Sequence, residues 1–199
     1  MISEKHIKKY SYNIAQYNSG DFIYEENSTC NSYFQIISGI VKLNNYSEDG
    51  KEFIQNIINA PQGFGEVLLF INEKYPTNAV ALTDCKIIQI SSKEFFKLLA
   101  EHPEYAIEIN KSLSRRLYYK MIMSQHIFSN DPSMRLKTLM NYFKNIYCIE
   151  NDLDSEYIIP LTRQQMANLT GLRVETVIRV IKLMEKNNLL RIKKGLIYY

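Results

Sequence analysis

The chain of 199 residues is 46% hydrophobic, enough to bury a full core in one domain or in two modest ones. No stretch approaches the roughly 20 apolar residues that a transmembrane helix needs, and the first residues lack an apolar run of signal-peptide length, so we expect a cytoplasmic protein with no membrane partner. Three widely spaced cysteines, Cys30, Cys85 and Cys148, exclude a disulfide framework and a cysteine-ligated metal cluster.

The formal net charge of +3 hides an asymmetry along the chain. Residues 1–130 hold 13 basic against 14 acidic residues, whereas residues 131–199 hold 11 against 7. From residue 160 onward the count is 8 against 2. Basic residues that neutralise phosphates supply most of the sequence-independent affinity for nucleic acid. The C-terminal third is therefore the part of the chain expected to touch nucleic acid.

The first hundred residues predict a compact antiparallel β-barrel or roll. Short runs rich in β-branched and aromatic residues, such as 22–26, 33–46 and 79–90, alternate with turn signals. Regular spacing of this kind is typical of compact antiparallel folds, and no internal repeat stands out. The turn signals are NSGD at 18–21, SG at 38–39, EDGK at 48–51 and PQGFGE at 61–66.

The pattern becomes helical from Ser91. Ser92 is expected to cap a short helix, and Pro103 marks a break before a long helix that runs to about Ser129. The long helix carries apolar residues at spacings of three and four. This stripe is longer than a neighbouring domain needs, so we expect it to pair with the same helix of a second chain, with packing on the roll alone as the alternative. The residues expected at this homodimer interface are Ile109, Leu113, Leu117, Met121 and Phe128.

Asn130 and Asp131 interrupt the long helix. Pro132 is expected to be the first residue of the next helix, because proline fits the first helical position. This interruption is the best domain boundary and a natural hinge. After the second helix, residues 150–156 form an acidic stretch, which is either a solvated loop or a surface offered to another protein. The residues expected to pack the second helix against the C-terminal segment are Leu136, Leu139, Met140 and Phe143.

Residues 161–188 predict two short helices joined by a tight turn, which is a helix-turn-helix. Thr162 and Gln165 have the spacing of a capping box, in which each side chain satisfies the other residue's backbone N–H. Gly171 can adopt the left-handed conformation that ends the first helix, and the second helix begins near Val174. The core stripe of the second helix consists of Val177, Val180, Ile181 and Met184.

The opposite face of the second helix predicts contact with double-stranded DNA. A recognition helix enters the major groove N-terminal end first, and arginine and glutamate side chains suit guanine and cytosine edges. Val174 and Ile178 are apolar on this polar face, so they either meet thymine methyl groups or pad the contact with the first helix. Residues 189–199 predict a hairpin, or wing, whose basic residues can lie along a phosphate backbone. The residues of the helix expected to touch DNA are Arg173, Val174, Glu175, Ile178, Arg179 and Lys182.

With a roll, a long helix, a hinge and a C-terminal helix-turn-helix in this order, the whole chain resembles the Crp/Fnr family of bacterial transcription regulators. The shared motifs include NSGD, SGIVKL, EDGKE, GFGEVLLF, DPSMRL and LTRQQMANLTGLRVETVIRVI. The resemblance implies an α+β fold in three parts. These are an N-terminal antiparallel β-roll of the cyclic-nucleotide-binding type (1–103), a dimerisation helix with its hinge (104–130) and a winged helix-turn-helix DNA-binding domain (131–199).

The resemblance also implies roles for single residues. Glu175 and Arg179 match the base-reading glutamate and arginine of the family, and Arg163 and Gln164 match positions that contact the DNA backbone. A homodimer would read two half-sites, and RNA polymerase is a further expected partner. The family has a small residue where Ile178 stands and a serine or threonine cap where Arg173 stands, so the half-site sequence is left open.

The effector pocket departs from the family pattern. In cAMP-binding members a glycine and a glutamate, matched by Gly65 and Glu66, precede an arginine and a serine or threonine that clamp the cyclic phosphate. These last two positions fall on Pro76 and Thr77. Proline offers neither a charge nor an N–H, and a charge-assisted hydrogen bond is worth about 1.5–3 kcal/mol. We therefore expect a roll that does not bind cAMP, with Lys74 as the alternative cation. The effector is then an unidentified small molecule, or there is none.

Other sites and activities receive little support from the sequence. His6, His102 and His126 show no metal-ligand spacing, and the N-terminal cysteines of the Fnr iron–sulfur cluster are missing, so no metal or cofactor is expected. An enzyme is not expected either, because no nucleophile–base pair or paired carboxylates have a suggestive spacing. The alternative to a DNA-binding regulator is a ligand-sensing module whose basic winged helix contacts protein or RNA.

Overall fold

The computed structural model describes residues 2–151 and 157–199. Its contacts divide the chain into two units, Met1–Ser114 and Arg115–Tyr199. The boundary between them lies inside the long helix α4, Pro103–Phe128, so this helix contributes residues to both units. In the described part of the chain, every helix is too short or too polar to traverse a bilayer.

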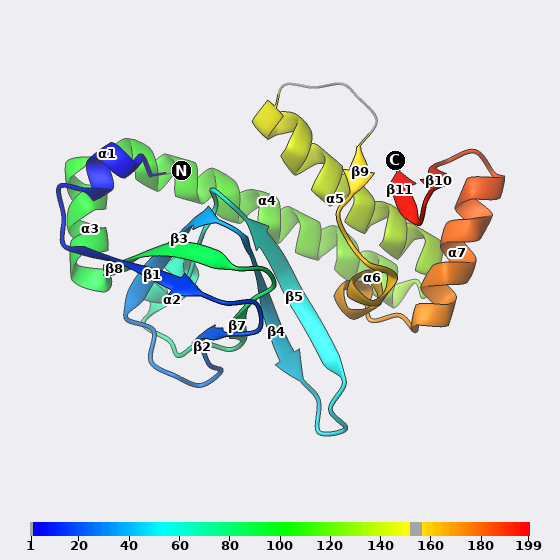
Figure 1. Ribbon diagram of the computed structural model, residues 1–199, viewed down its shortest axis with the longest axis horizontal. Coiled ribbons are helices and arrows are strands. Elements are labelled where there is room, and N and C mark those ends of the chain that lie inside the picture. Colours follow the sequence, from blue (N-terminus) through cyan, green and yellow to red (C-terminus); the bar gives the residue numbers. More distant parts are fainter. Residues whose placement is uncertain (1, 152–156) are drawn as a thin grey trace. The chain divides into compact units, whose positions relative to one another are not determined.

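Two four-stranded antiparallel sheets form the body of the first unit, which confirms the predicted β-roll (Figure 1). The turn signals at 18–21 and 48–51 lie between strands, and Gly39 of the SG signal separates two strands. The fourth signal, at 61–66, was wrong as a turn, because it contains the short strand Gly63–Phe64 and the first residue of a helix, Glu66. One sheet has the order β1-β8-β3-β6, with β1 at Tyr12–Tyr17, β8 at Cys85–Ser91, β3 at Ser32–Ser38 and β6 at Gly63–Phe64. The other has the order β2-β7-β4-β5, with β2 at Phe22–Tyr24, β7 at Asn78–Ala81, β4 at Ile40–Tyr46 and β5 at Glu52–Asn59.

The alternation of side chains along β3 and β8 separates two cores. Phe34 of β3 and Ile87 of β8 point into the interior of the roll, where they meet buried residues of β4, β5, β6 and β7. Tyr33 of β3 and Ile88 and Ile90 of β8 point the other way, into a second buried cluster with residues of the helices. One face of this sheet therefore lines the roll and the other carries helices.

Three short helices and the start of α4 complete the first unit. They are α1 at Glu4–Ile7, α2 at Glu66–Ile71 and α3 at Ser92–Glu101. The predicted cap of α3 was one residue too late: Ser91 is the N-cap, with extended backbone angles and a side-chain oxygen that accepts a hydrogen bond from the Glu94 N–H. Helices α1 and α2 were not predicted from the sequence.

A tight contact explains the glycine in the SG turn at 38–39. Gly39 has φ 98°, a left-handed conformation, and a Cβ built on it would lie 2.5 Å from the carbonyl oxygen of Asp84 and 2.6 Å from the Cys85 Sγ. A larger residue would therefore be strained in its backbone and would also collide with the start of β8. This glycine fixes the corner between β3 and β4.

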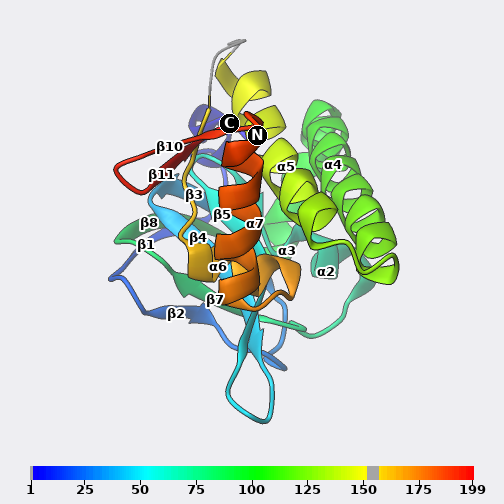
Figure 2. The ribbon, with the colours of Figure 1, turned by 90° about the vertical axis from the view of Figure 1, so that its right-hand side faces the viewer.

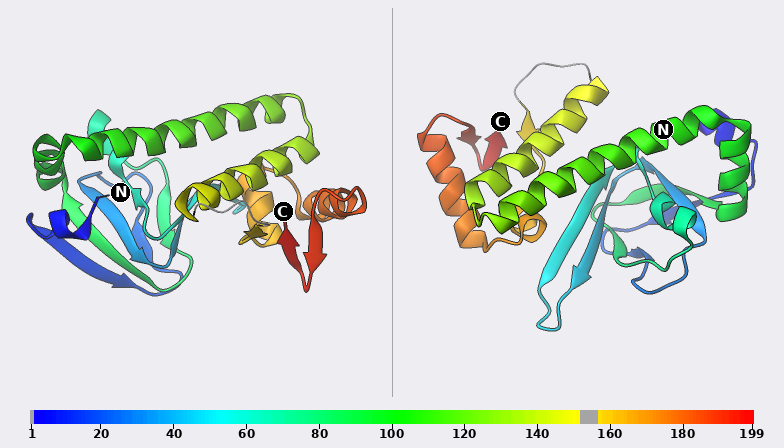
Figure 3. Two further views of the ribbon diagram at one scale, coloured as in Figure 1. Left: turned by 90° about the horizontal axis from the view of Figure 1, so that it is seen from above. Right: turned by 180° about the vertical axis from the view of Figure 1, so that it is seen from behind.

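The second unit holds the rest of α4, the helices α5, α6 and α7, and a small three-stranded sheet (Figure 3). Helix α5 packs against α6 and α7 as predicted, because its four apolar residues are all buried. The sheet has the order β10-β11-β9, and β9 is a strand that the sequence did not reveal. The bounds are α5 Pro132–Asn151, β9 Ile158–Ile159, α6 Arg163–Thr170, α7 Val174–Lys186, β10 Arg191–Lys193 and β11 Leu196–Tyr198.

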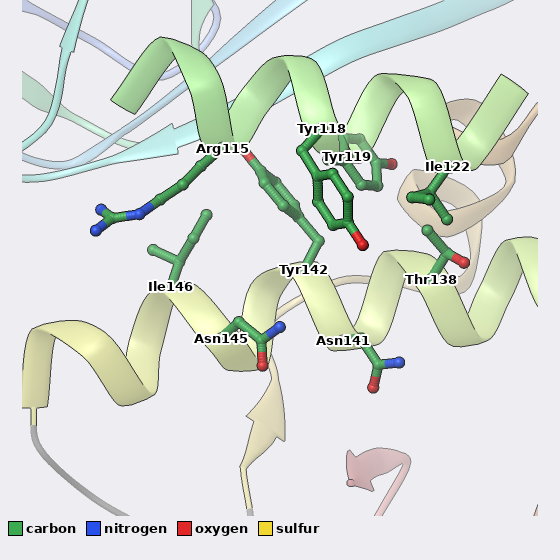
Figure 4. A pocket seen from close by; sticks show the side chains of 9 residues that line it. All are labelled: Arg115, Tyr118, Tyr119, Ile122, Thr138, Asn141, Tyr142, Asn145 and Ile146. Carbon is green, nitrogen blue, oxygen red and sulfur yellow. The ribbon is translucent and has the colours of Figure 1, made fainter. Parts of the chain in front are cut away.

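The last part of α4 lies beside α5 within this unit. The rings of Tyr119 and Tyr142 stack with centroids 4.2 Å apart, and burial raises the pKa of Tyr119 well above its usual range. Next to this stack is a pocket of about 370 Å³ (Figure 4). The side chains that line it are those of Arg115, Tyr118, Tyr119, Ile122, Thr138, Asn141, Tyr142, Asn145 and Ile146.

The predicted interruption between the two helices is confirmed. Pro132 begins α5, and the Asp131 carboxylate accepts hydrogen bonds from the N–H groups of Ser133 (2.9 Å) and Met134 (3.1 Å), as an N-cap residue does. The predicted acidic stretch at 150–156 lies outside the described residues, apart from its first two positions, which form the end of α5.

Candidate DNA-binding interface

The first helix of the predicted helix-turn-helix begins and ends as its sequence requires. Thr162 is the N-cap of α6: its hydroxyl accepts from the Gln165 N–H at 3.1 Å, and the Gln165 side chain accepts from the Thr162 N–H at 2.8 Å. Gly171, with φ 66°, ends α6 in the left-handed conformation, and its N–H donates to the Ala167 carbonyl. The predicted capping box and the predicted glycine turn are both confirmed.

Helix α7 begins at Val174, as predicted, and buries the expected stripe of Val177, Val180, Ile181 and Met184 against the rest of the unit. Side chains on its opposite face are exposed from Glu175 in the first turn to Lys186 in the last; Figure 2 shows the course of the helix, in orange. Arg173, Glu175, Arg179 and Lys182 are all exposed on it. One charged acceptor and three cations therefore stand on one accessible helix face.

The two apolar residues on this face differ in exposure. Ile178 is 39% exposed, whereas Val174 is half-buried in the first turn of α7. Arg173 occupies the N-cap position with extended backbone angles, and it makes no side-chain cap hydrogen bond among the residues that the structure describes. A guanidinium has no acceptor atom, so Arg173 cannot cap the N–H groups of α7 as the serine or threonine usual at this position would.

The hairpin that follows α7 is the predicted wing. Arg191 pairs with Tyr198, and Lys193 pairs with Leu196. Between the strands stand Lys194 (φ 50°) and Gly195 (φ 80°), two consecutive left-handed residues, as in a two-residue hairpin turn. Lys193, Lys194 and Gly195 are exposed at the tip. The wing thus presents cations in a narrow, regular strand pair.

Two side chains tie the helices to the wing, and the sequence did not reveal either contact. The Glu185 carboxylate of α7 accepts from the Ile192 N–H of β10 at 2.9 Å. The Arg163 guanidinium of α6 donates to the Gly195 carbonyl at 3.4 Å, and burial lowers the pKa of Arg163. Gln164, by contrast, is exposed and donates to Asn168 on its own helix at 2.8 Å. No spacing rule in the sequence links α6 or α7 to a hairpin residue, so these contacts depend on the folded unit.

In the first unit, Gly65 and Tyr75, the residue before Pro76, both approach the carbonyl oxygen of Ser32. A Cβ on Gly65 would lie 3.0 Å from the Ser32 carbonyl oxygen, and the Tyr75 hydroxyl donates to the same oxygen at 3.4 Å. Glu66 and Thr77 are buried, whereas Pro76 is exposed. The Pro76 carbonyl accepts from the Asn45 side-chain amide at 2.7 Å.

Aromatic rings fill much of the roll beside these residues. Tyr24 stacks on Tyr75 with ring centroids 3.6 Å apart, and Phe34 stacks on Phe64 at 5.1 Å. Burial raises the pKa of Tyr75 well above its usual range, as expected for a phenol surrounded by apolar groups. This part of the roll is apolar and densely packed.

Comparison with known proteins agrees with both halves of this architecture. The chain matches the family models of the cyclic nucleotide-binding domain over residues 14–102 and of the Crp-like helix-turn-helix domain over residues 138–198. It is 31% identical over 159 residues to the cAMP-activated global transcriptional regulator CRP of Haemophilus influenzae, covering 79% of this chain and 70% of that protein. It is 27% identical over 191 residues to the CRP of Salmonella typhimurium, covering 95% of this chain and 87% of the relative.

A solved structure gives the same answer for the fold. The c-di-GMP responsive global regulator CLP of Xanthomonas campestris superposes with a TM-score of 0.72 and 18% sequence identity, covering 98% of this chain and 96% of that chain. The two domain matches, the identity to the regulators and the exposed helix-turn-helix agree with one another. The chain belongs to the Crp/Fnr family of DNA-binding transcription regulators.

Proposed function

We propose that the chain binds DNA as a homodimer that places two α7 helices in successive major grooves of an operator with two half-sites. The observation that carries this proposal is the fully accessible outer face of α7, with Arg173, Glu175 and Arg179 near its N-terminal end. Half-sites for such a pair lie about 34 Å apart, one turn of the double helix.

The proposed base contacts follow from side-chain chemistry. Arg179 can donate two hydrogen bonds to guanine O6 and N7, and Glu175 can accept from cytosine N4. Ile178 is open enough to meet a thymine methyl group, whereas the half-buried Val174 is better placed to pad the helix contact. Arg163, Gln164, Arg173 and Lys182 would approach phosphates around this centre, with Arg163 close to the wing.

The proposed dimer surface is the exposed apolar part of α4. Leu117 is 62% exposed, Met121 58% and Phe128 94%. These spacings of four and seven place the three side chains on one side of the helix, where the same surface of a second copy would cover them. Ile109 and Leu113, the other two residues expected at this interface, lie elsewhere on the helix: Ile109 is buried in the core of the roll unit, and Leu113 packs against it, partly buried.

We further propose that the roll does not respond to cAMP, although the relatives named above are cAMP-activated. The residue at the position of the phosphate-clamping arginine is Pro76, which is exposed and uncharged. Stacked aromatic rings occupy the neighbouring space. A thermal-shift titration tests this directly, since ligand at 100 times its Kd adds about 2.7 kcal/mol of stability. Clear stabilisation by micromolar cAMP would contradict the proposal.

Selection of bound DNA from a random pool, followed by gel-shift titration, tests the DNA-binding proposal. Arg179→Ala should weaken binding to the selected operator by about 1–3 kcal/mol and relax the preference at one base pair. Lys186→Ala, in the last turn of the same helix, is the matched control. It should change the affinity only slightly, and by the same factor for every DNA sequence. If the pool yields no preferred sequence and binding is weak throughout, contact with protein or RNA becomes the better interpretation.

Two further measurements test the assembly. Leu117→Glu should turn a dimer into a monomer in light scattering, whereas Lys111→Glu, an exposed change on the same helix, should leave the dimer intact. RNA polymerase is the proposed partner once the operator is bound. Transcription from a template carrying the selected operator should change when the regulator is added and should not change with Arg179→Ala.

A further inference from the structure

Two histidines that are far apart in the sequence meet where α3 ends and α4 begins. The imidazole rings of His6 and His102 stack with centroids 4.1 Å apart and planes inclined by 12°. The Glu104 carboxylate lies beside them, with Oε1 3.2 Å from the His102 Nδ1. One ligand atom of each of these three residues lies within 4.8 Å of the other two. The DNA interface and the roll interior use none of these groups.

The N-terminal segment holds His6 firmly at this position. Ile2 and Ile7, on either side of it, are buried in the core cluster that also contains Tyr105. The Tyr105 hydroxyl accepts from the Ser3 N–H at 3.2 Å and lies 2.7 Å from the His6 Nδ1. A histidine whose Nδ1 is engaged by a fixed hydroxyl is oriented, and its Nε2 remains for a ligand. Tyr105 is thus placed to position the His6 ring.

We propose that His6, His102 and Glu104 form a binding site for a divalent transition-metal ion of the zinc class. Two imidazoles and one carboxylate, with water in a fourth position, form a ligand set that suits zinc, whereas magnesium and calcium prefer oxygen ligands alone. Ligand atoms in a tetrahedral zinc site at about 2.1 Å from the ion lie about 3.4 Å apart. A ring nitrogen binds a metal ion in the plane of its ring, so the His102 ring must turn out of its stack on His6 to share one ion with it. The side chains of His102 and Glu104 are 21% and 60% exposed, so both can rotate while Tyr105 holds the His6 ring.

The ion would join the N-terminal segment to the first turn of α4. Its ligands come from α1, from the residue that caps α3 and from α4, so binding would tie together three elements of the first unit. Because the ion binds the folded arrangement and not the separated segments, it would stabilise this corner by mass action.

The test is a titration of the chelator-treated, tag-free full chain with Zn²⁺ by calorimetry and with Co²⁺ by visible absorption. One ion per chain should bind, with a Co²⁺ spectrum of nitrogen and oxygen ligands. Glu104→Gln, at an exposed position, should weaken binding, and Tyr105→Phe should weaken it about 10–100-fold by releasing His6. His102→Asn should remove the Co²⁺ spectrum.

The third histidine provides the matched control. His126, at the other end of α4, lies outside the cluster, so His126→Asn should bind Zn²⁺ and Co²⁺ as the unaltered chain does. The proposal is overturned if the unaltered chain binds no Zn²⁺ at micromolar concentration. It is also overturned if Glu104→Gln and His102→Asn bind with unchanged affinity and spectrum, or if His126→Asn abolishes binding. Glu104→Gln keeps the test valid should His102→Asn fold poorly.

Discussion

Arg135 holds the end of α4 to the start of α5, and its replacement should open this corner. The residue is only 8% exposed. Its Nε donates to the His126 carbonyl at 3.3 Å and its Nη2 donates to the Ile127 carbonyl at 3.1 Å. The last carbonyls of a helix lack partners within the helix, and a cation there also interacts favourably with the helix dipole. The guanidinium therefore satisfies acceptors that the helix itself cannot.

Arg135→Met keeps the buried aliphatic stem and removes these two hydrogen bonds, together with a third from Nη2 to the Asn130 Oδ1 that, at 3.5 Å, is too long to add much. Each charge-assisted bond contributes about 1.5–3 kcal/mol. Both carbonyls also accept from a backbone N–H, of Asp131 and Asn130 respectively, so they do not become orphaned and the lower end of the range applies. Two bonds at about 1.5 kcal/mol give an expected loss of about 3 kcal/mol in the free energy of unfolding.

Urea unfolding, combined with hydrogen exchange at the amides of residues 126–135, measures this loss. Lys137→Met is the matched control, because it removes one positive charge from an exposed position of the same helix and should change stability by no more than about 0.5 kcal/mol. Amides at the corner should exchange faster in Arg135→Met than in the control. Equal stability and equal exchange in the two variants would refute the role assigned to Arg135.

Three further changes have defined outcomes. Thr162→Ala should lower the free energy of unfolding by about 1 kcal/mol in urea titrations, because it removes the N-cap bond of α6. Lys194→Asn keeps the left-handed turn and removes a wing cation, so gel shifts should show weaker binding to all DNA sequences alike and a salt slope smaller by about 1. The hydrogen bond to Glu101, aided by burial, raises the pKa of Tyr10 to about 12, so its stabilising effect is complete below the unfolded pKa of about 10 and is lost as the pH rises through 12. Ultraviolet titration should show a phenol that ionises near pH 12 and is missing in Tyr10→Phe, whereas the phenols of Tyr75 and Tyr119, whose pKa values are also raised, should ionise alike in both proteins.

The helix-turn-helix could be predicted almost residue by residue because its signals are local. A capping box needs two side chains three positions apart, and Gly171 acts on its own backbone. The buried stripe of α7 follows from helical periodicity alone, and the structure confirms each of its four members. The alternating strands and turn glycines of the roll are equally local, which is why the antiparallel fold was also predicted correctly.

Features that need a distant partner could not be predicted. Strand β9 has two residues, and only its pairing with β11 makes it a strand. The cap of α3 was misplaced by one residue because Ser91 and Ser92 are both suitable, and the pairing of β8 with β3 up to Ser91 decides between them. The meeting of His6 with His102 depends on how α1 packs on the core, so no spacing in the sequence indicates it.

The apolar stripe of α4 combines two roles that periodicity alone cannot separate. At about 100° per residue, Leu117, Met121 and Phe128 project within about 40° of one another, roughly 100° away from the direction of Ile109. Ile109 is buried in the roll unit, whereas the other three are more than half exposed. A sequence pattern counts both sets as one stripe because both recur every three or four positions. The burial of the side chains separates the stripe into two parts. Ile109 packs within its own chain, whereas Leu117, Met121 and Phe128 form an exposed apolar surface. The proposed second copy would cover this exposed surface.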